Sequence, residues 1–238
     1  MRTIGKMGNK YIVDVSSYNG NVDWAALKKS GIVGGIVKII KKDLTRDNQF
    51  NANYAKLNTN KMPWGVYNYS YATTPEKARS DMRIVCDILD KLDLTYFKYG
   101  VWFDIEDSAQ SHLSKAQFAK IINAAQEIVE GRGYTFGVYT GMAYYNNHIA
   151  GSDVNCKNWW IARYYNGYTQ MALMQAPNES YKPLTTLDPV AWQYSSSVVI
   201  PASGNSGRGD VSVLYHDPVG PNESKKVNNM KVQIGSAR

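Results

Sequence analysis

The stretch from Tyr99 to Asp107, YGVWFDIED, places three carboxylates within four residues at the end of an apolar run. In a strand, residues i and i+2 face the same side, so Asp104 and Glu106 should project together, with Asp107 opposite or in the following loop. Buried carboxylates that crowd together cannot all be ionised cheaply, so at least one pKa should be raised. A protonated carboxylic acid beside an ionised one is the pair that hydrolyses a glycosidic bond.

Two further acids occupy strand positions elsewhere in the chain. Asp14 interrupts the apolar run YIVDV, and Asp210 begins DVSVLY. In an eight-stranded barrel the first and last strands are neighbours, and catalytic side chains gather at the carboxyl ends of the strands. Asp14 and Asp210 are therefore expected to lie near each other and to converge on Asp104 and Glu106.

A structural interpretation of the same acids stays open at this point. Asp104 and Glu106 could form ion pairs with Lys38 or Arg163, and the other two acids could cap loops. A D-x-E pair alone is weak support for catalysis, whereas four acids at strand positions of one barrel give the two interpretations equal weight.

The elements that must position these acids alternate along the chain. Apolar segments typical of strands lie at 11–17, 34–40, 63–72, 99–107, 134–140, 158–165, 191–197 and 209–216, and helical patterns lie at 22–31, 48–60, 74–92 and 114–129, with a short helix or loop after 140. Thr74-Pro75 predicts one helix start, and the capping box from Ser114 to Gln117 predicts another. Five strand–helix units followed by three strands favour a barrel of the triosephosphate-isomerase type, with a doubly wound sheet as the alternative.

The length of 238 residues fits one large domain, and no internal boundary or repeat is visible. We expect an N-terminal extension over 1–10, a catalytic barrel over 11–218, and a polar tail or linker over 219–238. The first ten residues lack the apolar segment of a secretory signal, and no run of about eighteen apolar residues occurs. We therefore expect synthesis in the cytoplasm, or earlier removal of a signal, and no insertion into a membrane.

Composition narrows the class of partner. Hydrophobic residues make up 44% and charged residues 20%, as in ordinary globular proteins. The net charge of +7 favours anionic partners such as nucleic acid, membrane surfaces or bacterial wall polymers, although a merely solvated basic surface is the commoner case. Acids at the strand ends would repel phosphate, which argues against nucleic acid.

Eighteen tyrosines and six tryptophans exceed what a core alone requires. These side chains have an apolar face and a polar edge, and they suit a carbohydrate groove. On the third strand, either the tyrosines or the alternating Asn68 and Ser70 face inward. Five aromatic residues are predicted to contact substrate: Tyr67, Tyr69, Tyr139, Tyr164 and Trp192.

Cysteine and histidine give no sign of a metal or cofactor. Cys86 and Cys156 are interpreted as buried thiols, although a disulfide between them is not excluded. The three histidines lack ligand spacing, so neither a zinc site nor any cofactor is expected.

Seven motifs, in order, resemble glycoside hydrolase family 25, the Chalaropsis-type lysozymes or N-acetylmuramidases. The resemblance covers residues 10 to 217, and its motifs are DVSSYNGNVDW, GVYNYSYA, VWFDIED, GYTFGVYTG, WWIARYY, AWQYSSS and GDVSVLY. It implies a flattened (β/α)5(β)3 barrel that cleaves the β-1,4 bond from N-acetylmuramic acid to N-acetylglucosamine in peptidoglycan. It also implies that Glu106 is the catalytic acid and that Asp104, Asp14 and Asp210 are the other active-site acids.

The D-x-E motif also resembles that of chitinase-like barrels, in which the substrate's own 2-acetamido group is the nucleophile. By that analogy Asp104 orients the acetamide while Glu106 acts first as acid and then as base. One departure from the family is the segment after the second strand, VKIIKKDLTRDNQF, which keeps Lys38 but lacks the Glu-Gly of many members. Substrate contacts at that loop are expected to differ.

Two other functions remain as alternatives. A chitinase-like hydrolase would extend the motif upstream with acids, where this chain has Tyr99 and Trp102. A non-catalytic glycan-binding barrel would be expected to lack the acid at position 106. We expect a monomeric phage endolysin catalytic domain that acts on the bacterial cell wall after release or export.

Overall fold

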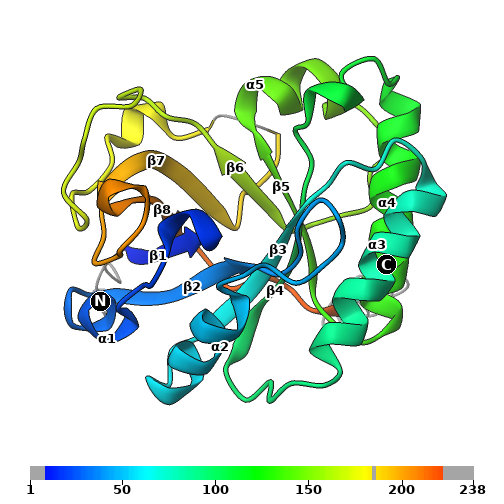
Figure 1. The fold of residues 1–238 in the computed structure, drawn as a ribbon. Coiled ribbons are helices and arrows are strands. Elements are labelled where there is room, and N and C mark those ends of the chain that lie inside the picture. Colours follow the sequence, from blue (N-terminus) through cyan, green and yellow to red (C-terminus); the bar gives the residue numbers. More distant parts are fainter. Residues whose placement is uncertain (1–8, 184–185, 222–238) are drawn as a thin grey trace, which may run out of the picture.

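Eight strands of the computed structural model close into one barrel, in the order of the sequence (Figure 1). The structure describes residues 9–183 and 186–221. The strands are β1 (Lys10–Val15), β2 (Ile32–Lys38), β3 (Trp64–Tyr69), β4 (Phe97–Asp104), β5 (Phe136–Gly141), β6 (Trp159–Ala162), β7 (Ala191–Val199) and β8 (Arg208–Leu214). Neighbours from β1 to β7 pair in parallel, whereas β8 runs antiparallel to both β7 and β1. The single-domain α/β barrel is confirmed, and the alternative of an open doubly wound sheet is wrong.

Helices cover only part of the barrel. They are α1 (Trp24–Lys29), α2 (Phe50–Thr59), α3 (Pro75–Leu89), α4 (Lys115–Gly131) and α5 (Met142–Tyr144), and α5 continues into a π-helical turn at Tyr145–Ile149. Figure 1 shows α3 and α4 side by side along one flank, while β7 and β8 have no α-helix beside them. This is the predicted arrangement of five strand–helix units followed by three strands.

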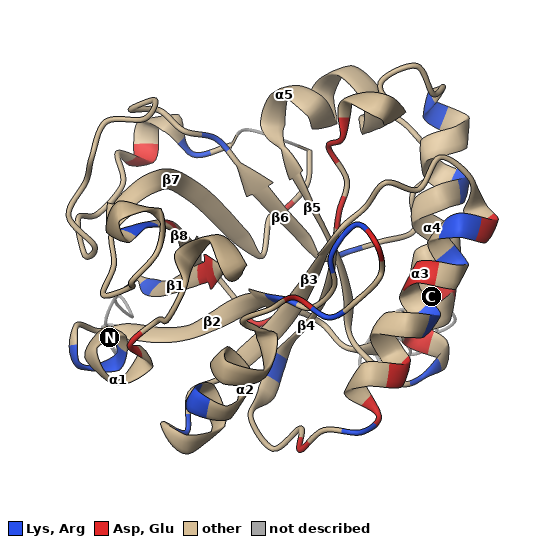
Figure 2. Cartoon of the chain, viewed as in Figure 1, with Lys and Arg blue, Asp and Glu red and all other residues tan. Residues whose placement is uncertain are grey.

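The helix starts follow from local chemistry. The Thr74 side chain accepts from the Lys77 backbone N–H, and Pro75 occupies the first position of α3, where a missing N–H costs nothing. Ser114 and Gln117 form the predicted capping box at the start of α4. Figure 2 shows basic and acidic residues interspersed along α3, whereas on α4 the lysines lie in the first half and the glutamates in the second.

The barrel interior is built in layers by strand alternation. An apolar layer inside the barrel, below the acids, contains Ile12, Ile36, Trp102, Trp160 and Leu214. Trp102 fits because its β5 neighbour is Gly137, where a Cβ would lie 2.4 Å from the indole ring. This layer closes the bottom of the barrel and leaves the positions nearer the carboxyl ends of β1 to β7 to polar side chains.

Both cysteines are free and buried, as interpreted from the sequence. Burial raises the pKa of each thiol to about 12, so both remain neutral thiols.

No helix within the described ranges is long and apolar enough to span a membrane. Residues 1–8 and 222–238, most of the predicted extension and tail, lie outside the described residues.

Candidate active site

A pocket of about 340 Å³ opens above the apolar layer, at the carboxyl ends of the parallel strands. Acids, tyrosines and amides dominate its walls. It is lined by Asp14, Ser16, Tyr18, Asn19, Lys38, Tyr67, Tyr69, Asp104, Glu106, Tyr139, Trp160, Tyr164, Gln193, Asn205 and Asp210. All four acids predicted from the sequence are therefore brought together in one cavity.

Asp104 and Glu106 share one wall of the pocket, although β4 ends at Asp104. The chain stays extended beyond the strand because the Ile105 N–H donates to the Tyr139 carbonyl oxygen at 3.0 Å. The Thr140 hydroxyl donates to the Ile105 carbonyl oxygen at 2.8 Å, which ties the same segment to β5. These two bonds preserve the alternation that points both carboxyl groups inward.

Burial raises the pKa of both carboxyl groups. For Asp104, which is 5% exposed, loss of solvation raises the pKa well above 3.8, the Glu106 charge raises it further, and Lys38 opposes the shift. For Glu106, loss of solvation raises the pKa and a hydrogen bond from the Gly141 backbone opposes it. A raised pKa suits Glu106 to donate a proton near neutral pH.

Asp14 and Asp210 form a second acidic pair on the neighbouring wall. They are direct partners in the antiparallel pairing of β1 and β8. Burial raises both pKa values, and the Asp210 charge adds to the shift of Asp14. The pKa of Asp210 rises to about 6 and that of Asp14 rises well above its ordinary range, while the hydrogen bond from Gln193 opposes the shift of Asp14, so the pair binds protons more firmly than isolated carboxyl groups do.

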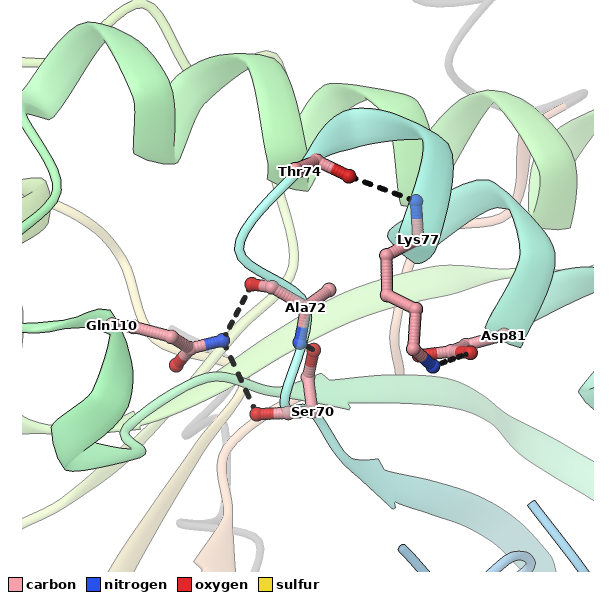
Figure 3. A network of polar contacts seen from close by, with 6 residues as sticks. All are labelled: Ser70, Ala72, Thr74, Lys77, Asp81 and Gln110. Carbon is pink, nitrogen blue, oxygen red and sulfur yellow. Dashed lines mark hydrogen bonds and ion pairs between the residues drawn. The ribbon is translucent and has the colours of Figure 1, made fainter. Parts of the chain in front are cut away.

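Asp107 is separate from these acids. Its carboxylate caps the following turn by accepting from the Ala109 N–H at 2.9 Å, and it also accepts from the Tyr69 hydroxyl at 3.1 Å. Gln110 of the same turn donates to the carbonyl oxygens of Ser70 and Ala72, beyond β3 (Figure 3). The loop carrying Glu106 is thus fastened to the loop after β3.

Four of the five predicted aromatic residues line the pocket: Tyr67, Tyr69, Tyr139 and Tyr164. The tyrosines of β3 face the pocket, while Asn68 and Ser70 are buried on the other side of that strand. Lys38 lies over the rings of Tyr67 and Tyr69, at 5.9 and 5.7 Å from their centroids.

Trp192 does not line the pocket, contrary to the prediction. It is fully buried behind β7, and its indole N–H donates to the Arg163 carbonyl oxygen at 2.9 Å. The neighbouring Gln193 faces the pocket instead, because successive strand residues point to opposite sides. Trp192 is therefore a core residue.

Two pocket residues of particular interest were missed from the sequence, Tyr18 and Gln193. Tyr18 is 80% exposed at the pocket, on a turn that Ser16 and Asn19 hold through a capping box. The alternation of β7 could have identified Gln193, since Trp192 and Tyr194 mark the opposite face. No comparable signal in the sequence places Tyr18.

A second cavity of about 360 Å³ adjoins the first. It shares Glu106, Tyr139 and Tyr164 with the main pocket and is otherwise lined by Gly141, Met142, Ala143, Ala162 and Arg163. Glu106 thus stands between two cavities, as an acid must if it protonates an oxygen that joins two sugar units.

The alternative ion pairs are not formed. Arg163 instead donates to the backbone carbonyl oxygens of Tyr181 and Lys182. No ion pair within residues 9–183 and 186–221 joins Asp104 or Glu106 to a basic side chain. Over the same ranges, no cluster of three or more His, Cys, Asp or Glu side chains could hold a metal ion.

Solved structures share this fold. The autolysin LytC from Streptococcus pneumoniae, described in complex with a synthetic peptidoglycan ligand, is 25% identical with a TM-score of 0.67, over 89% of this chain and 48% of LytC. The catalytic domain of endolysin ply40 from bacteriophage P40 of Listeria monocytogenes is 17% identical with a TM-score of 0.68, over 88% of this chain and 95% of that domain. The Cpl-1 endolysin, complexed with a peptidoglycan analogue, is 20% identical with a TM-score of 0.64, over 89% of this chain and 55% of Cpl-1.

The chain thus spans about half the length of LytC and of Cpl-1. No curated protein matches it. The sequence model described as glycosyl hydrolases family 25 matches residues 13–203, which include Asp14, Asp104 and Glu106. With most of its length matched and its acids gathered in one pocket, the chain belongs to glycosyl hydrolases family 25.

Proposed function

We propose that this protein is a lysozyme that cleaves the β-1,4 bond from N-acetylmuramic acid to N-acetylglucosamine in bacterial peptidoglycan. The observation that carries the proposal is the placement of Glu106 beside Asp104, in a pocket lined by tyrosines and between two adjoining cavities. LytC and Cpl-1, which share the fold, have been solved with peptidoglycan ligands.

Glu106 is the proposed general acid and then general base. Its raised pKa keeps a proton available for the leaving oxygen, and after bond cleavage the resulting carboxylate accepts a proton from the attacking water. Because Glu106 borders both cavities, one sugar unit can lie in each of them with the bridging oxygen near the acid.

Asp104 is the proposed partner of the substrate's 2-acetamido group. Its Oδ1 atom is buried and accepts no hydrogen bond from the described residues. An acetamide N–H would satisfy that oxygen and favour the ionised form of Asp104, since a donated hydrogen bond stabilises the carboxylate. The oriented acetamide oxygen could then attack the sugar carbon, giving an oxazolinium-like intermediate.

Asp14 and Asp210 supply negative charge on the neighbouring wall of the pocket. An ionised Asp210 would stabilise positive charge that develops at the sugar carbon in the transition state. Tyr67, Tyr69, Tyr139 and Tyr164 are proposed to bind the sugar, because their rings and hydroxyls offer the mixed surface that a saccharide requires.

The proposed biological setting is that of a phage endolysin catalytic domain acting on the cell wall as a monomer. Residues 11–218 are proposed to form the catalytic unit. The net charge of +7 would favour contact with an anionic wall.

The decisive experiment compares wild type, Glu106→Gln and Asp107→Asn on purified Gram-positive peptidoglycan. New reducing ends are reduced with borohydride and identified by mass spectrometry. The proposal expects muramic-acid ends from wild type and Asp107→Asn, and at least a 100-fold loss in Glu106→Gln. Equal release by Glu106→Gln would exclude Glu106 as the acid.

The same products separate the remaining alternatives. Glucosamine ends, or cleavage of chitin oligosaccharides, would indicate a chitinase-like hydrolase, whereas binding without new ends would indicate a glycan-binding barrel. Proton NMR of the fresh product reports its anomeric form. Inversion at the anomeric carbon would exclude the acetamido route.

A further inference from the structure

The side chain of Gln193 is held at three points inside the barrel. It lies on β7, is 2% exposed, and accepts at Oε1 from the hydroxyls of Tyr139 at 2.7 Å and Tyr164 at 2.6 Å. Its Nε2 group donates to Oδ2 of Asp14 at 2.8 Å. The amide therefore connects two tyrosines on one wall of the pocket to an acid on another.

The two tyrosines determine which way the amide points. A carbonyl oxygen has two lone pairs, and the two hydroxyls use both of them. The amide NH₂ group must then face the opposite direction, toward Asp14. Because Tyr139 belongs to β5 and Tyr164 follows β6, the framework that orients Gln193 is part of the barrel wall.

Most of the charged side chains around Asp14 in the pocket are acids. Asp210 faces it from β8, and the charge of Asp14 in turn acts on Asp104 of β4 and on the tyrosines of the pocket. Lys38 of β2 is the pocket's basic side chain, and its charge acts on Asp104. Gln193 is thus the neutral side chain that donates to Asp14 within the described ranges.

We propose that Gln193 is a positioning residue: it anchors Oδ2 of Asp14, fixes the orientation of that carboxyl group beside Asp210, and favours its ionised form. This inference rests on the proposed function, because it assigns a role in glycoside hydrolysis. The hydrogen bond from Gln193 lowers the pKa of Asp14 and so limits the rise that burial and the Asp210 charge cause.

Loss of the amide would free the Asp14 carboxyl group to rotate and would raise its pKa further, since the donated hydrogen bond stabilises the carboxylate. Asp14 would then carry less negative charge when the sugar carbon becomes positive. Because that charge matters most in the transition state, kcat should fall while KM changes little.

The experiment uses Gln193→Met, which keeps the length but removes all three hydrogen bonds, and Gln193→Glu, which keeps an acceptor for both tyrosines. The control is Asn158→Leu. Asn158 is another buried amide with three side-chain hydrogen bonds, but it lies at the amino end of β6, away from the pocket. Thermal unfolding of all variants is measured beside kcat and KM.

Gln193→Met is expected to lose about 10- to 100-fold in kcat, the effect of one hydrogen bond to a charged group. In Gln193→Glu the new carboxyl group donates to Asp14 only when protonated, so activity should recover as the pH falls and the optimum should move about one pH unit lower. Asn158→Leu should lose stability but keep the wild-type kcat and pH profile.

Wild-type kcat in Gln193→Met would overturn the proposal. So would a Gln193→Glu profile with the wild-type shape, since a merely structural role would not shift it. Carboxyl-carbon NMR titration of Asp14 and Asp210 in wild type and Gln193→Met gives a readout independent of activity. If wild type releases no reducing ends, the proposed function fails, and an altered titration of the pair still tests the anchoring of Asp14.

Discussion

Asp14 and Asp210 are paired across the junction where the barrel closes, on antiparallel strands β1 and β8, with their carboxyl groups in one pocket. Residues almost two hundred positions apart thus form an acidic pair in which burial raises the pKa of both members. Burying two ionised carboxyl groups side by side costs folding free energy at neutral pH.

Asp210→Asn should stabilise the protein at about pH 7 and reduce activity. The folded pKa of about 6 exceeds the ordinary 3.8, so the contribution of Asp210 to stability is present below 3.8 and is lost as the pH rises through 6. The amide avoids that loss and should raise the free energy of unfolding by about 1 to 3 kcal/mol at pH 7. Urea unfolding should show the difference shrinking toward pH 4.

Asp47→Asn provides the contrast for this experiment. Asp47 is 3% exposed, but it accepts from the backbone N–H groups of Ser17 at 3.2 Å and Gln49 at 2.9 Å. Its replacement should destabilise the fold at both pH values. Equal behaviour of the two variants would show that crowding of acids does not cause the effect at Asp210.

Gly141→Ala should extend activity to higher pH. A Cβ at position 141 would lie 3.6 Å from Oε2 of Glu106, an ordinary contact that removes solvent from the carboxyl group without a clash. Further loss of solvation raises the pKa of an acid, so the protonated form of Glu106 should persist to higher pH. The alkaline limb of kcat should move upward by a few tenths of a pH unit.

Gly131→Ala is the matched control for this shift. A Cβ there meets nothing within 4 Å, at the end of α4. Its pH profile should coincide with that of wild type. A downward shift in Gly141→Ala would contradict the assignment of Glu106 as the acid whose proton limits activity.

Tyr18→Ala should weaken substrate binding without destabilising the fold. The ring is 80% exposed at the pocket and is free to stack on a sugar. Loss of about 1 kcal/mol of stacking corresponds to a KM about five- to tenfold higher, with little change in thermal unfolding. Tyr168→Ala removes another ring, 76% exposed and outside the pocket, and should leave KM unchanged.

Trp192→Phe should lower stability but not KM. The substitution leaves a small cavity and removes the hydrogen bond to the Arg163 carbonyl oxygen, at a cost of about 1 to 3 kcal/mol. Urea unfolding and steady-state kinetics on solubilised peptidoglycan measure the two effects separately. An increase in KM as large as that of Tyr18→Ala would show that Trp192 contributes to substrate binding.

Alternation and strand order were enough to predict the barrel and the meeting of its acids. Asp14 and Asp210 could be paired because closure forces the first and last strands together, whatever the details of packing. The same reasoning gives the wrong position for Trp192. An aromatic ring suits a saccharide groove, but the alternation of β7 turns this ring into the core. Because Trp192 and Tyr194 face the core, the residue between them, Gln193, must face the pocket.

Tyr18 could not have been found in this way. It lies on a short turn after β1, and the orientation of its ring depends on the capping box of Ser16 and Asn19 and on the hydrogen bond from the Ser17 N–H to Asp47. These contacts join segments that have no common periodicity in the sequence. Surface turns of this kind carry function but leave little trace in hydrophobic pattern.

The reversed direction of β8 makes the hairpin between β7 and β8 an adjustable part of the barrel. Asp210 enters the pocket near the amino end of β8, so the residues between 199 and 208 lie at the rim of the site, where Gly204 and Arg208 hydrogen-bond to Asn19 in the turn that carries Tyr18. The irregularities in pairing after Gln193 and after Ser195 already absorb differences in strand length. Lengthening this hairpin would therefore reshape the rim of the pocket and shift the Tyr18 turn, while Gln193 and Asp210 stay in place.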